Sequence, residues 1–423
     1  MTLKGEVSAQ TDPASRKAAV RRRFRLALLA FVLPLMLVPV VIAVHSGVYD
    51  SWFDNSINAY GMWGVFAIYL SSRPSREEAL LVFGLAAILR AVHWILVKES
   101  PYFGYSVINI GHYLAFFAIP ILGWRSFRGR RQDIHRLMFG GVSLILYMSV
   151  FLAYYVSFAR IVCHDKLDYL LYAFDGTLGP HINFTIAQVV SSLSPLRTLL
   201  NTTYDSVGFF MGLMFALHIN LAGNRLNILK LNIINPIIGF SLYFLYPAMG
   251  PKYAFPAFPQ LPGVLPLAPA LLTGGPPNAM PSLHIGTALL IFFLARPWKW
   301  LRWITGVYLF LMMLAVFSTG EHYLVDTIVA LPYALMIMAL SSTTRESKSV
   351  LFLSAGMLGL WLFALRFGVF TPWISWALTL TTLAVTVILE RRLAAGLWSG
   401  GRAPKESPAV YLAAPESLGA TSG

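Results

Sequence analysis

The sequence predicts an all-α fold, namely a polytopic helical bundle embedded in a membrane. Of its 423 residues, 57% are hydrophobic and 12% are charged, and the mean hydropathy is +0.66. Soluble globular domains carry about twice that share of charged residues. Apolar stretches long enough to cross a hydrocarbon layer of about 30 Å recur along most of the chain, separated by short basic or Gly/Pro-rich loops. These observations exclude a soluble globular protein.

We expect about twelve membrane spans, because that many apolar stretches follow one another along the chain. The second and the eighth are short for a span and are expected to be tilted or half-buried. In chain order, the stretches cover residues 25–45, 58–71, 78–97, 105–124, 136–160, 200–222, 230–248, 282–296, 301–318, 323–343, 350–367 and 373–390.

The basic residues mark orientation rather than a nucleic-acid partner, although the formal net charge is +14. They gather before the first span and after the fourth, eighth, tenth and twelfth spans. With twelve spans and a cytosolic N-terminus, all of these clusters lie on the cytosolic side, as the positive-inside rule requires. We therefore expect no nucleic-acid binding. The clusters are found within residues 21–25, 125–136, 296–302, 345–348 and 391–392.

The chain divides into three predicted regions. Residues 1–134 hold four spans without obvious chemistry, residues 135–343 hold six spans, and residues 344–423 hold two spans and a tail. The first span follows a basic segment but lacks a small-residue cleavage site, which predicts an uncleaved anchor. The tails, 1–20 and 396–423, have the composition of disordered segments. Cys163 is the single cysteine, so no internal disulfide can form.

Two short motifs in the middle region carry candidate chemistry. Pro281, Ser282 and His284 indicate a helix start, with proline at the first helical position and free N–H groups that favour an anion. His322 and Asp326 are four residues apart, which predicts one helix face. The carboxylate could then accept the N–H of one ring nitrogen and leave the other nitrogen as a nucleophile.

The predicted topology brings both histidines to one side of the membrane. The eighth span runs inward from His284 to a basic loop, and the ninth span returns to Ser318, shortly before His322. Taken separately, His284 could be a solvated interfacial histidine, and His322 with Asp326 an incidental pair. Together they fit phosphoryl transfer, in which one imidazole attacks phosphorus and a second protonates the departing oxygen.

At these residues the chain resembles the type 2 phosphatidic acid phosphatase superfamily, especially the subgroup that contains the fungal inositol phosphorylceramide synthases. The resemblance covers roughly residues 165–343. It implies a six-helix core without metal or cofactor, with His322 as nucleophile, Asp326 as its orienting partner and His284 as the acid for the leaving group. The matching positions are Pro281, Ser282, His284, Ser318, Gly320, His322, Tyr323 and Asp326.

The cations of the superfamily pattern are missing. No lysine followed by Arg-Pro at the usual spacing is present, and Thr319 stands where an arginine often follows the serine. We expect Lys252, Ser282 and Ser318 to bind the substrate phosphate, although Lys252 could equally be a lysine that only reaches towards the membrane surface. Weaker candidates are Lys166 and Arg197. The loss of these cations also occurs among the transferases and favours transfer over hydrolysis.

The expected function is therefore that of a multi-pass enzyme, in a bacterial plasma membrane, that moves a phosphoryl or phospho-alcohol group from a lipid at the extracytosolic leaflet. Its expected partners are a lipid phosphate or phospholipid, an alcohol or water as acceptor, and membrane lipids. A lipid phosphate phosphatase is the alternative, and a transporter is a further one. Arg90, His93 and His112 lie at membrane depth, where they either line a headgroup cavity or pair with one another.

Overall fold

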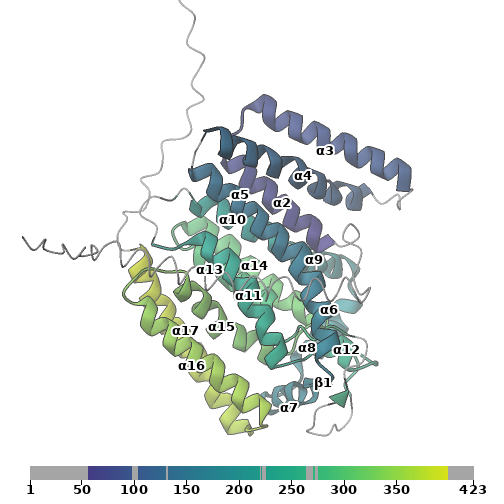
Figure 1. Ribbon diagram of the computed structural model, residues 1–423. Coiled ribbons are helices and arrows are strands. Elements are labelled where there is room, and N and C mark those ends of the chain that lie inside the picture. The colour runs from purple at the N-terminus through teal and green to yellow at the C-terminus, as the bar shows by residue number, and fades with distance from the viewer. Residues whose placement is uncertain are drawn as a thin grey trace, which may run out of the picture.

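Long helices packed side by side build most of the molecule (Figure 1). The computed structural model describes residues 56–97, 103–129, 132–219, 221, 225–262, 270–271 and 275–398. The predicted first span and both predicted disordered tails lie outside these residues, except for 396–398. The all-α membrane bundle is confirmed by the described residues.

The helices in the N-terminal half are α2 (Ser56–Ser71), α3 (Arg76–Val97), α4 (Phe103–Gly129), α5 (Gln132–Ile145), the π-helical segment η1 (Leu146–Phe151), α6 (Leu152–Val162), α7 (Asp168–Leu178), α8 (Ile182–Ser191) and α9 (Ser194–Asp205). In the C-terminal half they are α10 (Val207–Ile219), α11 (Ile228–Leu245), α12 (Pro251–Ala254), α13 (Leu283–Leu294), α14 (Lys299–Ser318), α15 (Leu324–Leu340), α16 (Ser347–Arg366) and α17 (Pro372–Trp398). Strands β1 (Asp165–Lys166) and β2 (Ala270–Leu271) form a small antiparallel pair.

In the described part of the chain, helices stand at most of the positions where the sequence predicts membrane spans. By length and composition, five of the described helices could cross a membrane, namely α3, α11, α14, α16 and α17. Helices α10, α13 and α15 are apolar but shorter. The short eighth span corresponds to α13, which has 12 residues. The structure therefore supports an integral membrane protein, while the total of twelve spans stays a prediction.

The predicted span 200–222 is wrong as a single element, because the helix breaks at Ser206. Helix α9 ends at Asp205, and α10 starts at Val207. The Ser206 hydroxyl donates to the carbonyl oxygen of Thr203 at 2.9 Å. Such local bonds from hydroxyl groups compete with regular helix pairing. Polar residues give α9 a surface character, so the apolar span begins at α10.

Close packing between α2 and α10 attaches the N-terminal helices to the rest of the bundle. A Cβ atom at Gly212 would lie 2.6 Å from the Cα atom of Gly64, which is closer than real carbon contacts allow. Glycine at these two positions therefore lets the backbones touch, as small residues do in membrane helix pairs. Helices α3 and α4 lie beyond α2, at the top of Figure 1.

A buried polar network joins the central helices α11, α13 and α15. The Tyr333 hydroxyl donates to the Asn235 side-chain oxygen at 2.8 Å, and the Asn235 amide donates to the Thr287 hydroxyl at 3.1 Å. Each of these residues comes from a different helix. Because unpaired polar groups are costly in an apolar interior, the network favours one relative position of the three helices.

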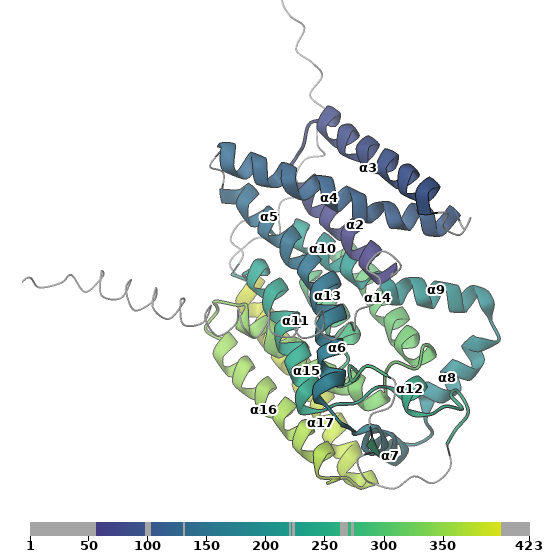
Figure 2. The same cartoon turned by 45° about the vertical axis from the view of Figure 1, so that its right-hand side comes forward.

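The two ends of the bundle differ in character. Short helices α7, α8, α9 and α12 gather at one end, seen at the lower right in Figure 2. Helices α7 and α8 and the first half of α9 form most of segment 163–199, which is too polar to be predicted as a membrane span. At the other end, Arg296 forms an ion pair with Glu390, and Arg225 donates to the carbonyl oxygen of Gly396 at 3.3 Å. The loops with basic clusters 296–302 and 345–348 lie at this second end.

Candidate active site

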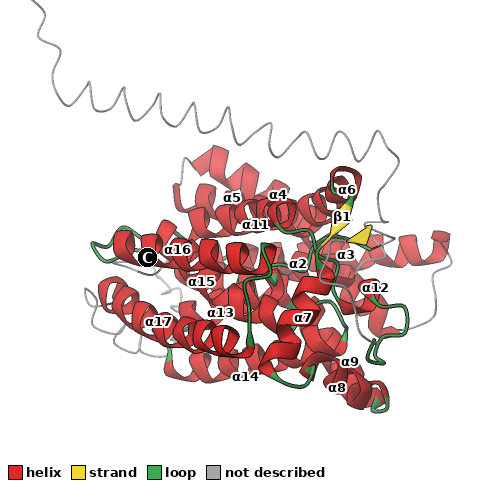
Figure 3. Cartoon of the chain, turned by 90° about the horizontal axis from the view of Figure 1, so that it is seen from below, coloured by secondary structure: helices red, strands yellow, loops and turns green. Residues whose placement is uncertain are grey.

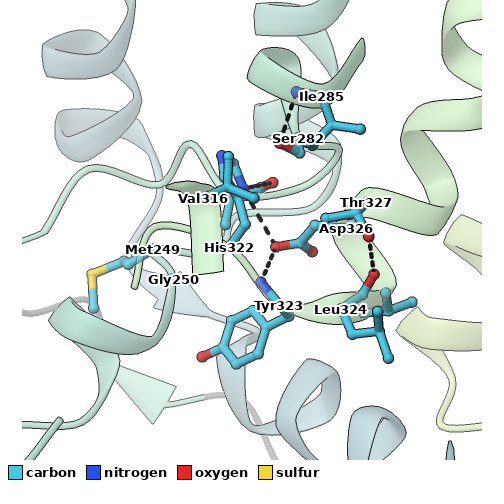
Figure 4. Close-up of polar contacts among 12 residues, drawn as sticks. Met249, Gly250, Ser282, Ile285, Val316, His322, Tyr323, Leu324, Asp326 and Thr327 are labelled. Carbon is cyan, nitrogen blue, oxygen red and sulfur yellow. Dashed lines mark hydrogen bonds and ion pairs between the residues drawn. The ribbon is translucent and has the colours of Figure 1, made fainter. Parts of the chain in front are cut away.

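His322 lies in the short connection between α14 and α15, at the end of the bundle where the short helices gather. The prediction that His322 and Asp326 share a helix face is wrong, because α15 begins only at Leu324. Tyr323 is the N-cap residue, with extended backbone, and the Asp326 carboxylate accepts its N–H at 2.8 Å (Figure 4). This capping interaction starts the helix after His322.

The imidazole of His322 is held mainly by a backbone carbonyl. Its Nδ1 atom lies 2.9 Å from the carbonyl oxygen of Ala279 and 3.5 Å from Oδ2 of Asp326. A carbonyl oxygen can only accept, so Nδ1 carries the proton and the neutral ring keeps a lone pair on Nε2. Burial, opposed by the charge of Glu321 and the bond to Ala279, lowers the pKa of His322 to about 4. His322 is therefore a neutral imidazole at neutral pH, with a lone pair on Nε2.

His284 is the second residue of α13 and lies next to His322. Their ring centroids are 6.1 Å apart, so one phosphate group could contact both rings. On its other side, the His284 ring stacks on Tyr204 of α9 with a centroid distance of 3.8 Å. The Nε2 atom of His284 is buried and has no hydrogen-bond partner among the described residues. This atom is free to exchange a proton with a bound oxygen.

The start of α13 differs in one detail from the prediction. Ser282 is the N-cap residue, and its hydroxyl accepts the N–H of Ile285 at 3.3 Å. Pro281 therefore precedes the cap instead of occupying the first helical position. Ser282 is also fully buried. Its hydroxyl is used in the structure to fix the helix that carries His284.

Two aspartates of α7 support the site, and sequence reasoning did not assign them a role. Asp175 accepts the N–H groups of Leu324 and Val325 at 2.8 and 3.0 Å, at the start of α15. Asp168 accepts the N–H of Gly250 at 2.9 Å and the Tyr323 hydroxyl at 2.9 Å. Asp175 thus holds the backbone that follows His322, and Asp168 joins the Tyr323 side chain to the backbone at Gly250. Their spacing of seven residues in an otherwise apolar helix is the signal that could have found them.

Burial also changes the acidity of these two aspartates. Loss of hydration raises the pKa of Asp168 to about 6, although its bonds to Met249, Tyr323 and Gly250 favour the charged form. Burial raises the pKa of Asp175 well above its usual range. Asp175 therefore avoids charge in these surroundings, whereas Asp168, which also lies near the charge of Lys166, is still largely ionised at neutral pH. Both carboxyl groups act through their hydrogen bonds to the backbone.

A polar cavity of about 410 Å³ reaches the neighbours of the two histidines, because Glu321 precedes His322 and Tyr204 stacks on His284, although neither histidine lines it. It is lined by two of the predicted phosphate-binding residues, Lys252 and Ser318, and also by Arg197 and Glu321. Lys252 forms an ion pair with Glu321. Burial acts to lower the pKa of Lys252, but the adjacent Glu321 carboxylate outweighs it and the net pKa is raised. Lys252 is therefore a charged group at the cavity, consistent with a role beyond lipid-surface contact.

The other predicted residues are distributed differently. Ser282 is not among the residues that line this cavity. Lys166 is buried, with its ammonium 5.9 Å from the ring centroid of Tyr169. Tyr204 lines the cavity and stacks on His284, so its ring separates the cavity from that histidine. Within the described part of the chain, no group of three or more His, Cys, Asp or Glu residues is placed to hold a metal ion.

The polar residues of the N-terminal spans interact with one another. Arg90 lies 3.5 Å from Nδ1 of His93, and the Tyr113 hydroxyl contacts the same nitrogen. His112 has its Nδ1 atom 3.3 Å from the carbonyl oxygen of Asn109. These contacts belong to α3 and α4, away from α13 and α15 in Figure 1. They favour pairing within the N-terminal helices over a role at the histidines.

The comparison with protein families agrees with this site. Residues 170–340 match the PAP2 superfamily. The match contains Asp175 of α7, both histidines and Asp326, and it supports the type 2 phosphatidic acid phosphatase superfamily. It does not extend to the inositol phosphorylceramide synthase-like subgroup. The comparisons with curated proteins and with solved structures found no match. The PAP2 match supports an enzyme that acts on phosphate esters, of the lipid phosphatase or phosphotransferase type.

Proposed function

We propose that this chain is a membrane-embedded lipid phosphotransferase that works through a phosphohistidine at His322. The observation that carries the proposal is the state of the His322 ring. Its Nδ1 proton is engaged by the Ala279 carbonyl, which leaves the Nε2 lone pair available, and His284 lies beside it. Phosphoryl transfer needs such a neutral nucleophile together with a separate proton donor.

The proposed reaction has two steps. In the first, Nε2 of His322 attacks phosphorus while the bond to the leaving alcohol breaks, and His284, whose protonation the anionic phosphate beside it favours, gives its proton to the departing oxygen. In the second, His284 takes the proton from an acceptor hydroxyl, whose oxygen attacks phosphorus and releases His322. Asp326, 3.5 Å from the ring, favours the positive charge that develops on His322. Lys252 and Ser318 would bind the phosphate oxygens from the cavity side.

The cavity supports transfer to an alcohol over hydrolysis by water. Its volume of about 410 Å³ is within the range of small-molecule sites, and polar side chains such as Lys252, Glu321 and Asn201 line it. A space of this size can hold an acceptor alcohol beside the substrate phosphate. The finer assignment, an inositol phosphorylceramide synthase-like enzyme, rests on the sequence resemblance alone. The lipid phosphate phosphatase stays the alternative.

A trapping experiment tests the chemistry. Purified protein is incubated with a panel of phosphorus-labelled lipid phosphates and phosphodiesters, with and without candidate alcohols, and the products are identified by mass spectrometry. We expect a label on the protein that acid removes and base does not, and its absence in His322→Ala. EDTA should leave turnover unchanged. Activity that disappears with EDTA and returns with zinc or magnesium would contradict the proposed roles of the histidines.

The proposed location of the site is the extracytosolic face, in line with the positive-inside rule. Leu261 lies at the histidine end of the bundle and Trp300 at the basic end, and both side chains are exposed. In a Cys163→Ser background, Leu261→Cys should react with a membrane-impermeant maleimide in intact cells, and Trp300→Cys should not. The reverse pattern would place the site on the cytosolic side.

A further inference from the structure

A groove of about 820 Å³ runs along the outer surface of α13 and α14. Helix α14 lies along the lower edge of the bundle in Figure 3. The residues of α14 that line the groove, at positions 299, 302, 303, 306, 307 and 310, recur every three or four residues. This spacing places them in one stripe along the helix.

The greater part of the groove is apolar and open. Trp303, Val307 and Phe310 are 68%, 57% and 59% exposed. Gly306 lies among them, and a Cβ atom added there would stand 3.5 Å from the ring of Phe292 on α13. The missing side chain therefore leaves room between the two helices. From residue 302 to residue 310 the helix rises about 12 Å, which provides a depth suited to part of an acyl chain.

Three cations line one end of this groove, namely Arg296, Lys299 and Arg302. Arg296 is neutralised by its ion pair with Glu390. Lys299 is exposed and has no acidic partner in the part of the chain that the structure describes. The guanidinium of Arg302 lies 5.1 Å from the ring centroid of Phe292, a contact that leaves its charge uncompensated. The groove therefore combines an apolar channel with two positive charges at its mouth.

The groove is separate from the histidines. His284 is at the beginning of α13 and Arg296 follows its end, so a helix of 12 residues lies between them. At about 1.5 Å per residue, the separation along the axis is about 18 Å. The groove thus opens towards the membrane leaflet opposite the candidate active site, and its role does not depend on the proposed function.

We propose that this groove binds one anionic phospholipid. Its phosphate lies at Lys299 and Arg302, and an acyl chain lies along Trp303, Gly306 and Phe310. The charge at the mouth selects the occupant, because a zwitterionic lipid gains no net attraction from two cations, whereas an anionic headgroup gains from both. The basic end is also the end expected at the cytosolic leaflet, where anionic lipids concentrate.

Native mass spectrometry of the detergent-solubilised full chain tests the proposal. The probes are phosphatidylglycerol and phosphatidylcholine with identical acyl chains, titrated separately. The variants are Lys299→Gln/Arg302→Gln, which removes the cations, and Gly306→Leu, which fills the groove. The control is Arg345→Gln/Lys348→Gln, which removes two exposed cations near the same end but outside the groove. Size-exclusion chromatography checks that each protein is folded.

For the wild type and the control, we expect phosphatidylglycerol to bind more tightly than phosphatidylcholine. The Lys299→Gln/Arg302→Gln variant should bind phosphatidylglycerol roughly 25-fold more weakly, about fivefold per cation. Its affinity for phosphatidylcholine should stay unchanged. The Gly306→Leu variant should bind one lipid molecule fewer than the wild type does. Equal losses in this double variant and the control would overturn the proposal. Displacement of phosphatidylglycerol by millimolar glycerol phosphate would also overturn it, because the groove would then hold a free anion.

Discussion

Asp326 lies beside His322 without being its closest partner. The Nδ1 atom of His322 is 3.5 Å from the Asp326 carboxylate and 2.9 Å from the carbonyl oxygen of Ala279. The carboxylate instead accepts the N–H of Tyr323 at 2.8 Å. The orientation of the ring therefore rests on the backbone, while Asp326 contributes an adjacent carboxyl group and the cap of α15. Substitutions of the two residues should therefore reduce turnover to different extents.

Replacing His322 should be far more damaging than replacing Asp326. His322→Ala removes the nucleophile, so we expect kcat to fall on the order of 10³-fold or more. Asp326→Asn keeps an oxygen that can accept the Tyr323 N–H, and the Ala279 carbonyl still orients the ring. A loss of about 10- to 100-fold is expected. Turnover of the purified variants measures both effects, with exposed His164→Ala as a control. Near wild-type turnover in His322→Ala would exclude the proposed nucleophile.

The enzyme should keep its activity in mild acid and lose it only near pH 4. Burial lowers the pKa of His322 to about 4, and the nucleophile must be neutral to attack. We therefore expect kcat/KM to decline near pH 4 instead of near 6.5, the ordinary value for histidine. Because the unfolded chain takes up this proton below about 6.5 and the folded chain below about 4, this group also makes the folded state less stable as the pH falls across that interval.

A single substitution checks the origin of this acid limit. The charge of Glu321 raises the pKa of His322 and so opposes the effect of burial. In Glu321→Gln that contribution is lost, and the decline of kcat/KM should move to still lower pH. A pH–rate profile from 3.5 to 8 on both proteins makes the comparison. A shift to higher pH in the variant would show that another group sets the limit.

Asp175 should be important for stability because it pairs with two buried backbone groups. Asp175→Ala leaves the N–H groups of Leu324 and Val325 without an acceptor. Each unsatisfied group costs about 1 to 3 kcal/mol, so a loss of about 2 to 6 kcal/mol is expected for the two groups. Asp175→Asn retains one acceptor oxygen and should lose less. The fraction of protein that stays folded after heating ranks the stabilities of the variants. The control Asp165→Ala, at an exposed position, should match the wild type.

The sequence was sufficient to predict the helical class and the convergence of His284 and His322. Apolar length defines the spans, and the alternation of basic loops fixes which helix ends meet. The acceptor for His322 could not be predicted, because it is the backbone carbonyl of Ala279, which every residue type possesses. The break at Ser206 was also missed, since hydropathy alone does not register the hydrogen bonds that a hydroxyl makes to the backbone.

Gly250 should be required for activity because its backbone lies directly against the residue before His322. Its φ is +88°, and a Cβ atom there would meet the carbonyl oxygen of Glu321 at 2.2 Å. In Gly250→Ala the backbone at Glu321 must shift, and displacement of a reacting group by about 1 Å can cost about 10²-fold in rate.

Gly179 is a matched control, because its φ is +136° but no atom lies within 4 Å of an added Cβ. Both alanines strain the backbone, whereas only the first disturbs the site. We expect kcat/KM to fall at least tenfold in Gly250→Ala and to stay close to wild type in folded Gly179→Ala. Equal kcat/KM in the two variants would mean that contact between Gly250 and Glu321 does not position His322.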